Sequence, residues 1–139
     1  MTGKVFVDSN VLIYAHDRDA PGKQQQAAGR LKTLWDTGLG RLSTQVLQEF
    51  YTNVTQKIKR PMARTVAREV IRNYGLWVES ALTPATVVRA SEISEAWMIS
   101  FWDGMILAAA EQDNVEELLT EDLNHGQLIV GIRVVNPFR

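Results

Sequence analysis

Short apolar segments that alternate with longer helical segments limit the fold of this chain more than any other feature. The first, residues 4–8, is an apolar run closed by an acid, and it predicts a buried strand followed by a loop. Further short strands are predicted at residues 41–43, 76–78, 117–120 and 132–135. This alternation is typical of βαβ units, in which helices cover both faces of a parallel sheet. We therefore predict a three-layer α/β/α fold with a central, mainly parallel sheet of four or five short strands.

Helical segments lie between these strands. Apolar residues at helical spacing predict helices over residues 24–37, 61–74, 84–97 and 100–110, and one more that Thr44 caps. Residues 10–16 begin either a helix or a turn. Thr83 and Pro84 predict a cap followed by proline at the first helical position. In such sheets, ligands collect at the carboxyl ends of the strands, near the point where the strand order reverses. The functional residues are expected at that edge.

The composition narrows the possible chemistry. A length of 139 residues suits one domain, so we expect a single domain over residues 1–139. Cysteine is absent and only His16 and His125 are present, which excludes disulfides and cysteine nucleophiles and disfavours a zinc site. The apolar stretch of residues 11–15 is too short for a signal peptide or a membrane span, and we expect a cytoplasmic protein.

Charge is unevenly distributed along the chain. Residues 1–79 contain 12 Lys and Arg against 7 Asp and Glu, whereas residues 80–139 contain 3 against 9, so the net charge of −1 conceals two halves of opposite sign. One interpretation is a basic surface beside an acidic pocket, which a polyanionic substrate held near a metal would require. The other is that the two halves interleave in space and the polarity averages out.

Acidic residues follow the predicted strands or open the predicted helices. Asp8 ends the first strand, Asp122 follows the strand over residues 117–120, and Asp103 lies three residues after Ser100 at a helix start. Each has a structural alternative, because Asp8 and Asp103 suit helix caps and the segment after Asp122 suits a turn. Glu121 competes with Asp122, since successive strand residues face opposite ways.

A fourth acid, Glu49, lies inside the helix that follows the second predicted strand, and by itself it suits a solvated helix flank. Considered together, the four positions converge on one edge of a doubly wound sheet. Four clustered carboxylates would repel each other without a cation, and Mg²⁺ prefers hard oxygen ligands. We therefore predict that Asp8, Glu49, Asp103 and Asp122 surround Mg²⁺ or Mn²⁺, in a site suited to phosphodiester cleavage.

The sequence resembles PIN-domain ribonucleases, especially the VapC-type toxins of prokaryotic toxin–antitoxin pairs. The resemblance rests on residues 7–13 (VDSNVLI), 48–50 (QEF), 100–106 (SFWDGMI) and 119–127 (LTEDLNHGQ), which follow the family's order and span nearly the whole chain. It maps the family's four acids, in order, onto Asp8, Glu49, Asp103 and Asp122, and its small polar residues onto Ser9, Asn10 and Thr120.

The resemblance also implies a function and partners. It implies a PIN-like fold, Mg²⁺ or Mn²⁺ as cofactor, RNA as substrate, a homodimer, and a cognate antitoxin whose tail blocks the site. Asp8 and Asp103 would hold the principal metal, while Glu49 and Asp122 would complete the site or orient the attacking water. The fourth position is the family's most variable one, so Asp122 is the least constrained of the four.

Two further patterns have open interpretations. Arg60, Arg64, Arg68 and Arg72 recur every four residues. They form either a solvated polar face or a track for RNA phosphates that an acidic antitoxin segment could also use. The four tryptophans, Trp35, Trp77, Trp97 and Trp102, are expected in the core or in a dimer interface, with base stacking by Trp102 as the alternative.

Two rival functions compete with the nuclease. A catalytically silent PIN-like module that binds RNA or protein is one, although acids stand at all four expected positions. A phosphatase that uses Asp8 as nucleophile is the other, and it is disfavoured because such enzymes usually carry a second acid where this chain has Asn10. A receiver domain is disfavoured as well, because no lysine lies near the last predicted strands.

Overall fold

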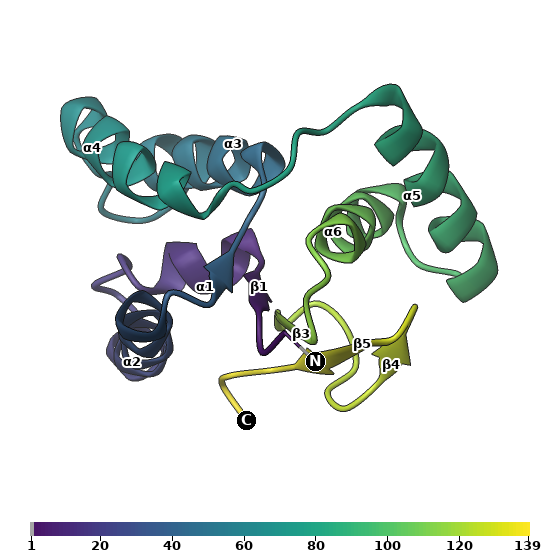
Figure 1. Ribbon diagram of the computed structural model, residues 1–139. Coiled ribbons are helices and arrows are strands. Elements are labelled where there is room, and N and C mark those ends of the chain that lie inside the picture. The colour runs from purple at the N-terminus through teal and green to yellow at the C-terminus, as the bar shows by residue number, and fades with distance from the viewer. Residues whose placement is uncertain (1) are drawn as a thin grey trace.

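The computed structural model describes residues 2–139 and contains short strands and longer helices in alternation (Figure 1). The elements are β1 (Val5–Val7), α1 (Ser9–Tyr14), α2 (Pro21–Thr37), β2 (Gly40–Arg41), α3 (Thr44–Thr52), the π-helix η1 (Asn53–Lys57), α4 (Arg64–Tyr74), the 3₁₀-helix η2 (Gly75–Trp77), α5 (Pro84–Trp97), α6 (Phe101–Gln112), β3 (Glu117–Leu119), β4 (Leu128–Ile129) and β5 (Ile132–Val135). None of the helices within residues 2–139 is long and apolar enough to cross a membrane.

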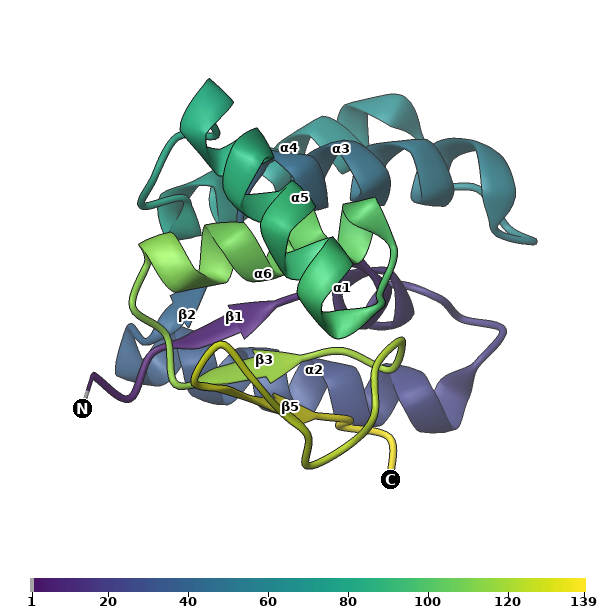
Figure 2. The same cartoon turned by 90° about the vertical axis from the view of Figure 1, so that its right-hand side faces the viewer.

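The five strands form one sheet in the order β2-β1-β3-β5-β4. Strands β2, β1, β3 and β5 run parallel to one another, and β4 alone runs antiparallel, against β5. Figure 2 shows this sheet between α2 on one side and α5 and α6 on the other. The predicted three-layer α/β/α fold with a mainly parallel sheet is therefore confirmed. The strand order reverses between β1 and β3, so the carboxyl ends of these two strands mark the ligand-binding edge.

Helix α6 is the most deeply buried helix of the fold. Its residues 104–110 are all buried, because α6 lies between the sheet and α5 and has no solvent-facing side over that stretch. Gly104 makes the close contact with α5 possible. A Cβ at this position would lie 2.5 Å from the backbone oxygen of Ala90, which no larger residue could tolerate without movement. The packing of Gly104 therefore fixes the start of α6, where Asp103 lies.

One predicted strand does not form, and one strand was not predicted. Residues 76–78 do not form a strand: Gly75–Trp77 is a 3₁₀-helix, and only a single bridge joins Val78 to Leu42. The Trp77 ring packs against Gly40, where a Cβ would lie 2.8 Å from the ring, and this packing holds the segment across the end of β2. The antiparallel strand β4 was missed. Its turn into β5 consists of Val130 and Gly131, both with positive φ, and the sequence Val-Gly is not a typical hairpin turn.

The observed helix ends agree only in part with those predicted from the sequence. Thr83 and Ser100 cap α5 and α6 as predicted, but the residue that precedes α3 is Ser43 rather than Thr44. Helix α4 begins at Arg64 and not at residue 61. The backbone N–H of Met62 donates to the carbonyl of Val54 at 2.7 Å, which keeps residues 61–63 extended across the end of η1.

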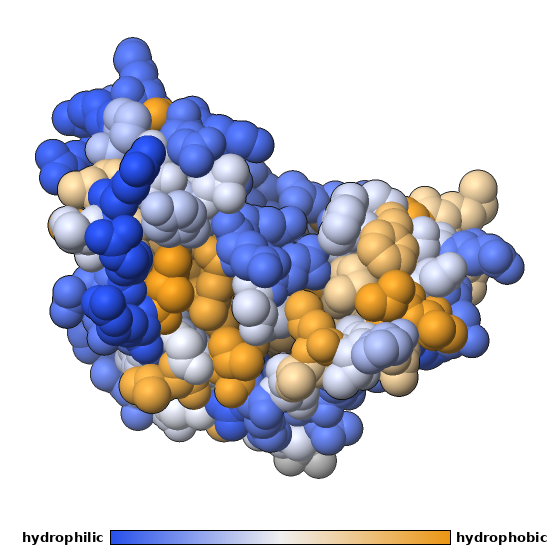
Figure 3. Space-filling model, turned by 90° about the horizontal axis from the view of Figure 1, so that it is seen from above, coloured by the Kyte–Doolittle hydropathy of each residue, from blue (hydrophilic) through white to orange (hydrophobic). Residues whose placement is uncertain are grey.

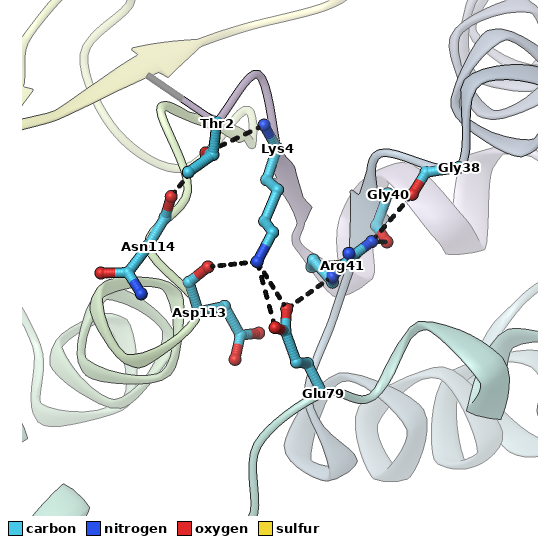
Figure 4. Close-up of polar contacts among 8 residues, drawn as sticks. All are labelled: Thr2, Lys4, Gly38, Gly40, Arg41, Glu79, Asp113 and Asn114. Carbon is cyan, nitrogen blue, oxygen red and sulfur yellow. Dashed lines mark hydrogen bonds and ion pairs between the residues drawn. The ribbon is translucent and has the colours of Figure 1, made fainter.

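A polar network holds the segment between η2 and α5 at the amino ends of the strands, away from the switch point (Figure 4). Glu79 accepts hydrogen bonds from Lys4 Nζ at 3.0 Å and from Arg41 Nε at 2.7 Å. Both basic groups hold the pKa of the Glu79 carboxyl below its usual value. The network thereby ties the linker to β1 and β2.

Candidate metal centre

Three of the four predicted site acids meet at the carboxyl ends of β1 and β3. One carboxylate oxygen each from Asp8, Asp103 and Asp122 lies within 4.8 Å of the others. Asp8 directly follows β1, Asp122 follows β3, and Asp103 lies in the first turn of α6. The sheet order makes β1 and β3 neighbours, and the packing of α6 on the sheet adds the third acid. Residues that are far apart in the sequence therefore form one acidic cluster.

Asp8 is the most enclosed member of this cluster. It is only 4% exposed, and its carboxylate accepts hydrogen bonds from the Ser9 backbone N–H at 2.7 Å and from the Thr120 hydroxyl at 2.9 Å. It also stands as the N-cap of α1. The capping alternative is thus true in part, since one oxygen caps the helix while the other faces the cluster.

The electrostatics of the cluster oppose its own ionisation. Burial raises the pKa of Asp8 to about 7, and the negative charges of Glu49 and Asp122 add to this, whereas the hydrogen bonds from Thr120 and Ser9 act in the opposite direction. Burial and the charge of Asp122 also raise the pKa of Asp103 above its usual value. Such raised pKa values mark a site that lacks positive charge.

Asn10 links the parts of the cluster. Its side-chain Nδ2 lies 3.1 Å from the Thr120 hydroxyl, 3.2 Å from Asp122 Oδ2 and 3.4 Å from Asp8 Oδ2. Its Oδ1 accepts the backbone N–H of Glu121 at 3.2 Å. Asn10 therefore fixes the loop after β3 relative to α1, and it leaves the remaining carboxylate oxygens free for a ligand.

The competition between Glu121 and Asp122 has a clear geometric outcome. Glu121 pairs with Lys23 at 2.8 Å, and Lys23 also lies over the Tyr14 and Phe138 rings. This pairing directs Glu121 away from the cluster, whereas Asp122 reaches it. Both residues stand in the bend that follows β3, where their side chains leave the backbone in different directions.

Glu49 lies at the margin of the cluster. It is not one of the three acids whose oxygens gather within 4.8 Å, but it is close enough for its charge to raise the pKa of Asp8. Gln45, one helical turn earlier on α3, is buried and directs its Nε2 toward Glu49 Oε2 at 3.5 Å and the Trp102 carbonyl at 3.4 Å. The sequence analysis missed Gln45, although its position four residues before Glu49 is a signal for such a contact.

The donor set fits a hard divalent cation. Among residues 2–139, no lysine, arginine or histidine forms an ion pair with the three clustered acids or with Glu49. The ligands on offer are carboxylate oxygens, which Mg²⁺ and Mn²⁺ prefer, and nitrogen and sulfur ligands are missing from the cluster. A cation at this position would offset both the burial of the Asp8 carboxylate and its repulsion by Glu49 and Asp122, which together raise the pKa of Asp8.

The tryptophans only partly fulfil the expectation of core packing. Trp77 is buried, and Trp35 packs on it and on Tyr74, whereas Trp97 is exposed at 40% and Trp102 at 64%. Trp102 directly precedes Asp103 in α6, and its ring packs edge-on against Phe101.

The family model of the PIN domain matches residues 5–128, which include all four acids. The chain belongs to the PIN-domain family. PIN domains are generally nucleases, and the acidic cluster lies within the matched part of this PIN domain. No protein of curated function matches the sequence.

Two solved structures share the fold of this PIN domain at low sequence identity. A chain of a toxin–antitoxin complex from Klebsiella pneumoniae is 17% identical, with a TM-score of 0.68 and coverage of 96% of this chain and 98% of that chain. A chain of VapBC2 from Rickettsia felis, bound to a DNA fragment from the promoter, is 15% identical, with a TM-score of 0.58 and coverage of 94% and 96%. These likenesses concern the fold.

Proposed function

We propose that this PIN domain is a metal-dependent endoribonuclease that uses Mg²⁺ or Mn²⁺. The observation that carries the proposal is the cluster of Asp8, Asp103 and Asp122, which no basic side chain within residues 2–139 neutralises by an ion pair. Asp8 and Asp103 would hold the principal cation, and Asp122 would complete its ligands. The proposed unit is a single domain over residues 1–139 that acts in the cytoplasm.

In the proposed reaction, water hydrolyses an RNA phosphodiester bond. A bound divalent cation would lower the pKa of water and stabilise charge on the phosphate. Glu49, at the margin of the cluster, accepts a hydrogen bond from the attacking water and orients it toward phosphorus. The water oxygen forms the new P–O bond, the bond to the 3′ oxygen breaks, and a proton passes to that oxygen. The products carry 5′-phosphate and 3′-hydroxyl ends.

The test is a cleavage assay on mixed total RNA with Mg²⁺, Mn²⁺ or EDTA. Wild type should give discrete fragments with either metal and none with EDTA, and Asp103→Asn should be inactive. Glu121→Gln is the matched control, because Glu121 pairs with Lys23 and should not be needed. Cleavage by Asp103→Asn at the wild-type rate would overturn the assignment. A folded protein that shows a metal-dependent rise in Tm but no cleavage would favour the silent binding module.

We further propose that the protein is the toxin of a toxin–antitoxin pair. One structure of the same fold is described as a toxin–antitoxin complex, and the other is VapBC2 bound to a promoter DNA fragment. A groove of about 380 Å³ between α3 and α4 is lined in part by Leu47, Tyr51 and Ile71, and it suits an apolar antitoxin segment. Figure 3 looks onto this side of the molecule and shows hydrophobic residues beside a row of strongly hydrophilic ones. Expression of wild type in a bacterial host should arrest growth, and expression of Asp103→Asn should not.

A further inference from the structure

A second pocket opens beside the acidic cluster, between α1 and the end of α3. Its volume is about 350 Å³, and its lining residues are Ser9, Gln48, Glu49, Thr52, Asn53 and Lys57. Ser9 directly follows Asp8, and Glu49 is the marginal acid of the cluster. The pocket therefore adjoins the proposed metal centre through Glu49, and Lys57 is the single basic residue of its lining.

The π-helix η1 determines where Lys57 lies. In an α-helix each residue turns by about 100°, so residues four apart drift steadily around the axis. Over Asn53–Lys57 the hydrogen bonds span five residues, as in the bond of 3.1 Å from the Ile58 N–H to the Asn53 carbonyl, and each residue turns less. Asn53 is displaced around the helix axis relative to Glu49, and the π-helix displaces Lys57 in the opposite direction relative to Asn53. The two displacements offset each other. Lys57 consequently lines the same pocket as Glu49, which lies about two helical turns before it in the chain.

The polar groups of the pocket are available to a ligand. Within residues 2–139 the Lys57 ammonium has neither an ion pair nor a hydrogen bond, and Lys57 is exposed. Asn53 donates its amide to the Glu49 carbonyl at 2.8 Å, which leaves its Oδ1 free as an acceptor. The pocket thus offers a cation, a hydroxyl at Ser9 and an amide oxygen. Such a set suits a phosphate and the hydroxyls of a neighbouring ribose.

We propose that this pocket binds the phosphate next to the scissile one in the RNA chain, with Lys57 as its positive partner. This inference rests on the proposed ribonuclease function. RNA that crosses the cluster must carry further phosphates past Glu49, whose charge repels them. Lys57 offsets this repulsion and holds the strand beside the cluster through a contact that does not involve the scissile bond. Lys57 is therefore a substrate-binding residue.

The first experiment measures RNA binding in EDTA, with Asp103→Asn as the parent protein so that no RNA is cleaved. The probe is a labelled pool of short single-stranded RNA of random sequence, followed by fluorescence anisotropy over a range of salt. Lys57→Gln should raise Kd about fivefold and make the salt slope shallower by about 0.7, the value for one phosphate contact on a single strand. Lys57→Arg should retain most of the binding. Lys59→Gln is the matched control, since Lys59 is exposed and outside the pocket lining, and it should change Kd less than twofold.

Steady-state cleavage by otherwise wild-type protein separates the two proposals. Lys57→Gln should raise KM about fivefold and leave kcat within about twofold, because the contact is made equally before and during the reaction. If the protein cleaves RNA but Lys57→Gln equals Lys59→Gln in KM, Kd and salt slope, the pocket assignment is overturned and the nuclease stands. If wild type neither cleaves nor binds RNA, both proposals fall.

Discussion

At the scale of single residues, the burial of Asp8 makes the metal-free protein sensitive to pH. Burial raises the pKa of Asp8 to about 7 in the fold, against an ordinary value of 3.8, so the folded state holds a proton that the unfolded chain releases. The stability that this proton provides is complete below pH 3.8 and is lost as pH rises to about 7. In EDTA we expect the free energy of unfolding of wild type to fall by about 2–4 kcal/mol over this range.

Asp8→Asn should remove most of this pH dependence and raise Tm at pH 7.5 in EDTA by about 3–8 °C. The gain is limited because the amide offers one acceptor oxygen, where the carboxylate accepts from both Ser9 and Thr120. The same variant should lose the rise in Tm that Mg²⁺ gives wild type. Thermal melts from pH 4 to 8 provide the measurement. Asp36 is an exposed acid on α2, and Asp36→Asn should show the same pH dependence of Tm as wild type. If Tm falls equally with rising pH in Asp8→Asn and Asp36→Asn, the role assigned to Asp8 is refuted.

A second prediction at this scale uses two adjacent acids. Asp122→Asn should lower the affinity for Mn²⁺ about tenfold or more, because it removes one of three clustered carboxylates. Glu121→Gln should leave the affinity unchanged, since Glu121 pairs with Lys23 outside the cluster. Isothermal titration with Mn²⁺ measures both. Equal losses in the two variants would mean that the affinity reflects the overall negative charge of the loop and not the ligand position.

At the scale of elements, the contact between α5 and α6 controls the position of Asp103. Gly104→Ala would place a Cβ 2.5 Å from the Ala90 backbone oxygen, so the two helices must move apart. We expect a loss of about 1–3 kcal/mol in stability and a weaker affinity for Mn²⁺, measured by denaturant melts and by titration. Gly29→Ala on α2 is the matched control. Nothing lies within 4 Å of its added Cβ, so stability should stay or rise by up to about 1 kcal/mol. A neutral Gly104→Ala would contradict this view of the helix contact.

The elements that the sequence predicts well are those whose signals are local. Neighbouring residues in the sequence are enough to indicate the buried strand β1, the proline after Thr83 and the Ser100 cap. The 3₁₀-helix Gly75–Trp77 and the hairpin at Val130 could not be predicted, because tertiary packing determines them.

In the candidate site, too, some features follow from local sequence signals and others from tertiary packing. The strand pattern predicts which acids reach the sheet edge, and three of them do meet there. Their distances, the marginal place of Glu49 and the turning of Glu121 toward Lys23 depend on contacts between distant segments. The π-helix that brings Lys57 to the pocket was not predicted, because the five residues Asn53–Lys57 are too few to show a periodicity that differs from that of an α-helix.

At the scale of the whole molecule, the charge asymmetry of the sequence is only partly averaged out. Ion pairs join the basic first half to the acidic second half at Lys23–Glu121 and Arg30–Glu117. Arg64 and Arg68 on α4 remain exposed, and the ion pairs among residues 2–139 do not include them. A basic face therefore persists on the same half of the molecule as the α3–α4 groove, which is the arrangement that an acidic partner or RNA would require.

The outer face of α5 provides the last prediction, which concerns the homodimer that the resemblance to PIN-domain toxins implies. Val88, Trp97 and Met98 are 62%, 40% and 91% exposed, and Figure 2 shows α5 on the outside of α6. Exposed apolar residues of this density suit burial against a second copy of the same chain. Val88→Glu should convert a dimer to a monomer in light scattering, while the metal-induced rise in Tm stays as in wild type. Val66→Glu makes the same change at a valine of 50% exposure on α4 and should leave the dimer intact. If the dimer survives Val88→Glu but not Val66→Glu, the interface lies on α4 and not on α5. The face that remains accessible to RNA would then be a different one.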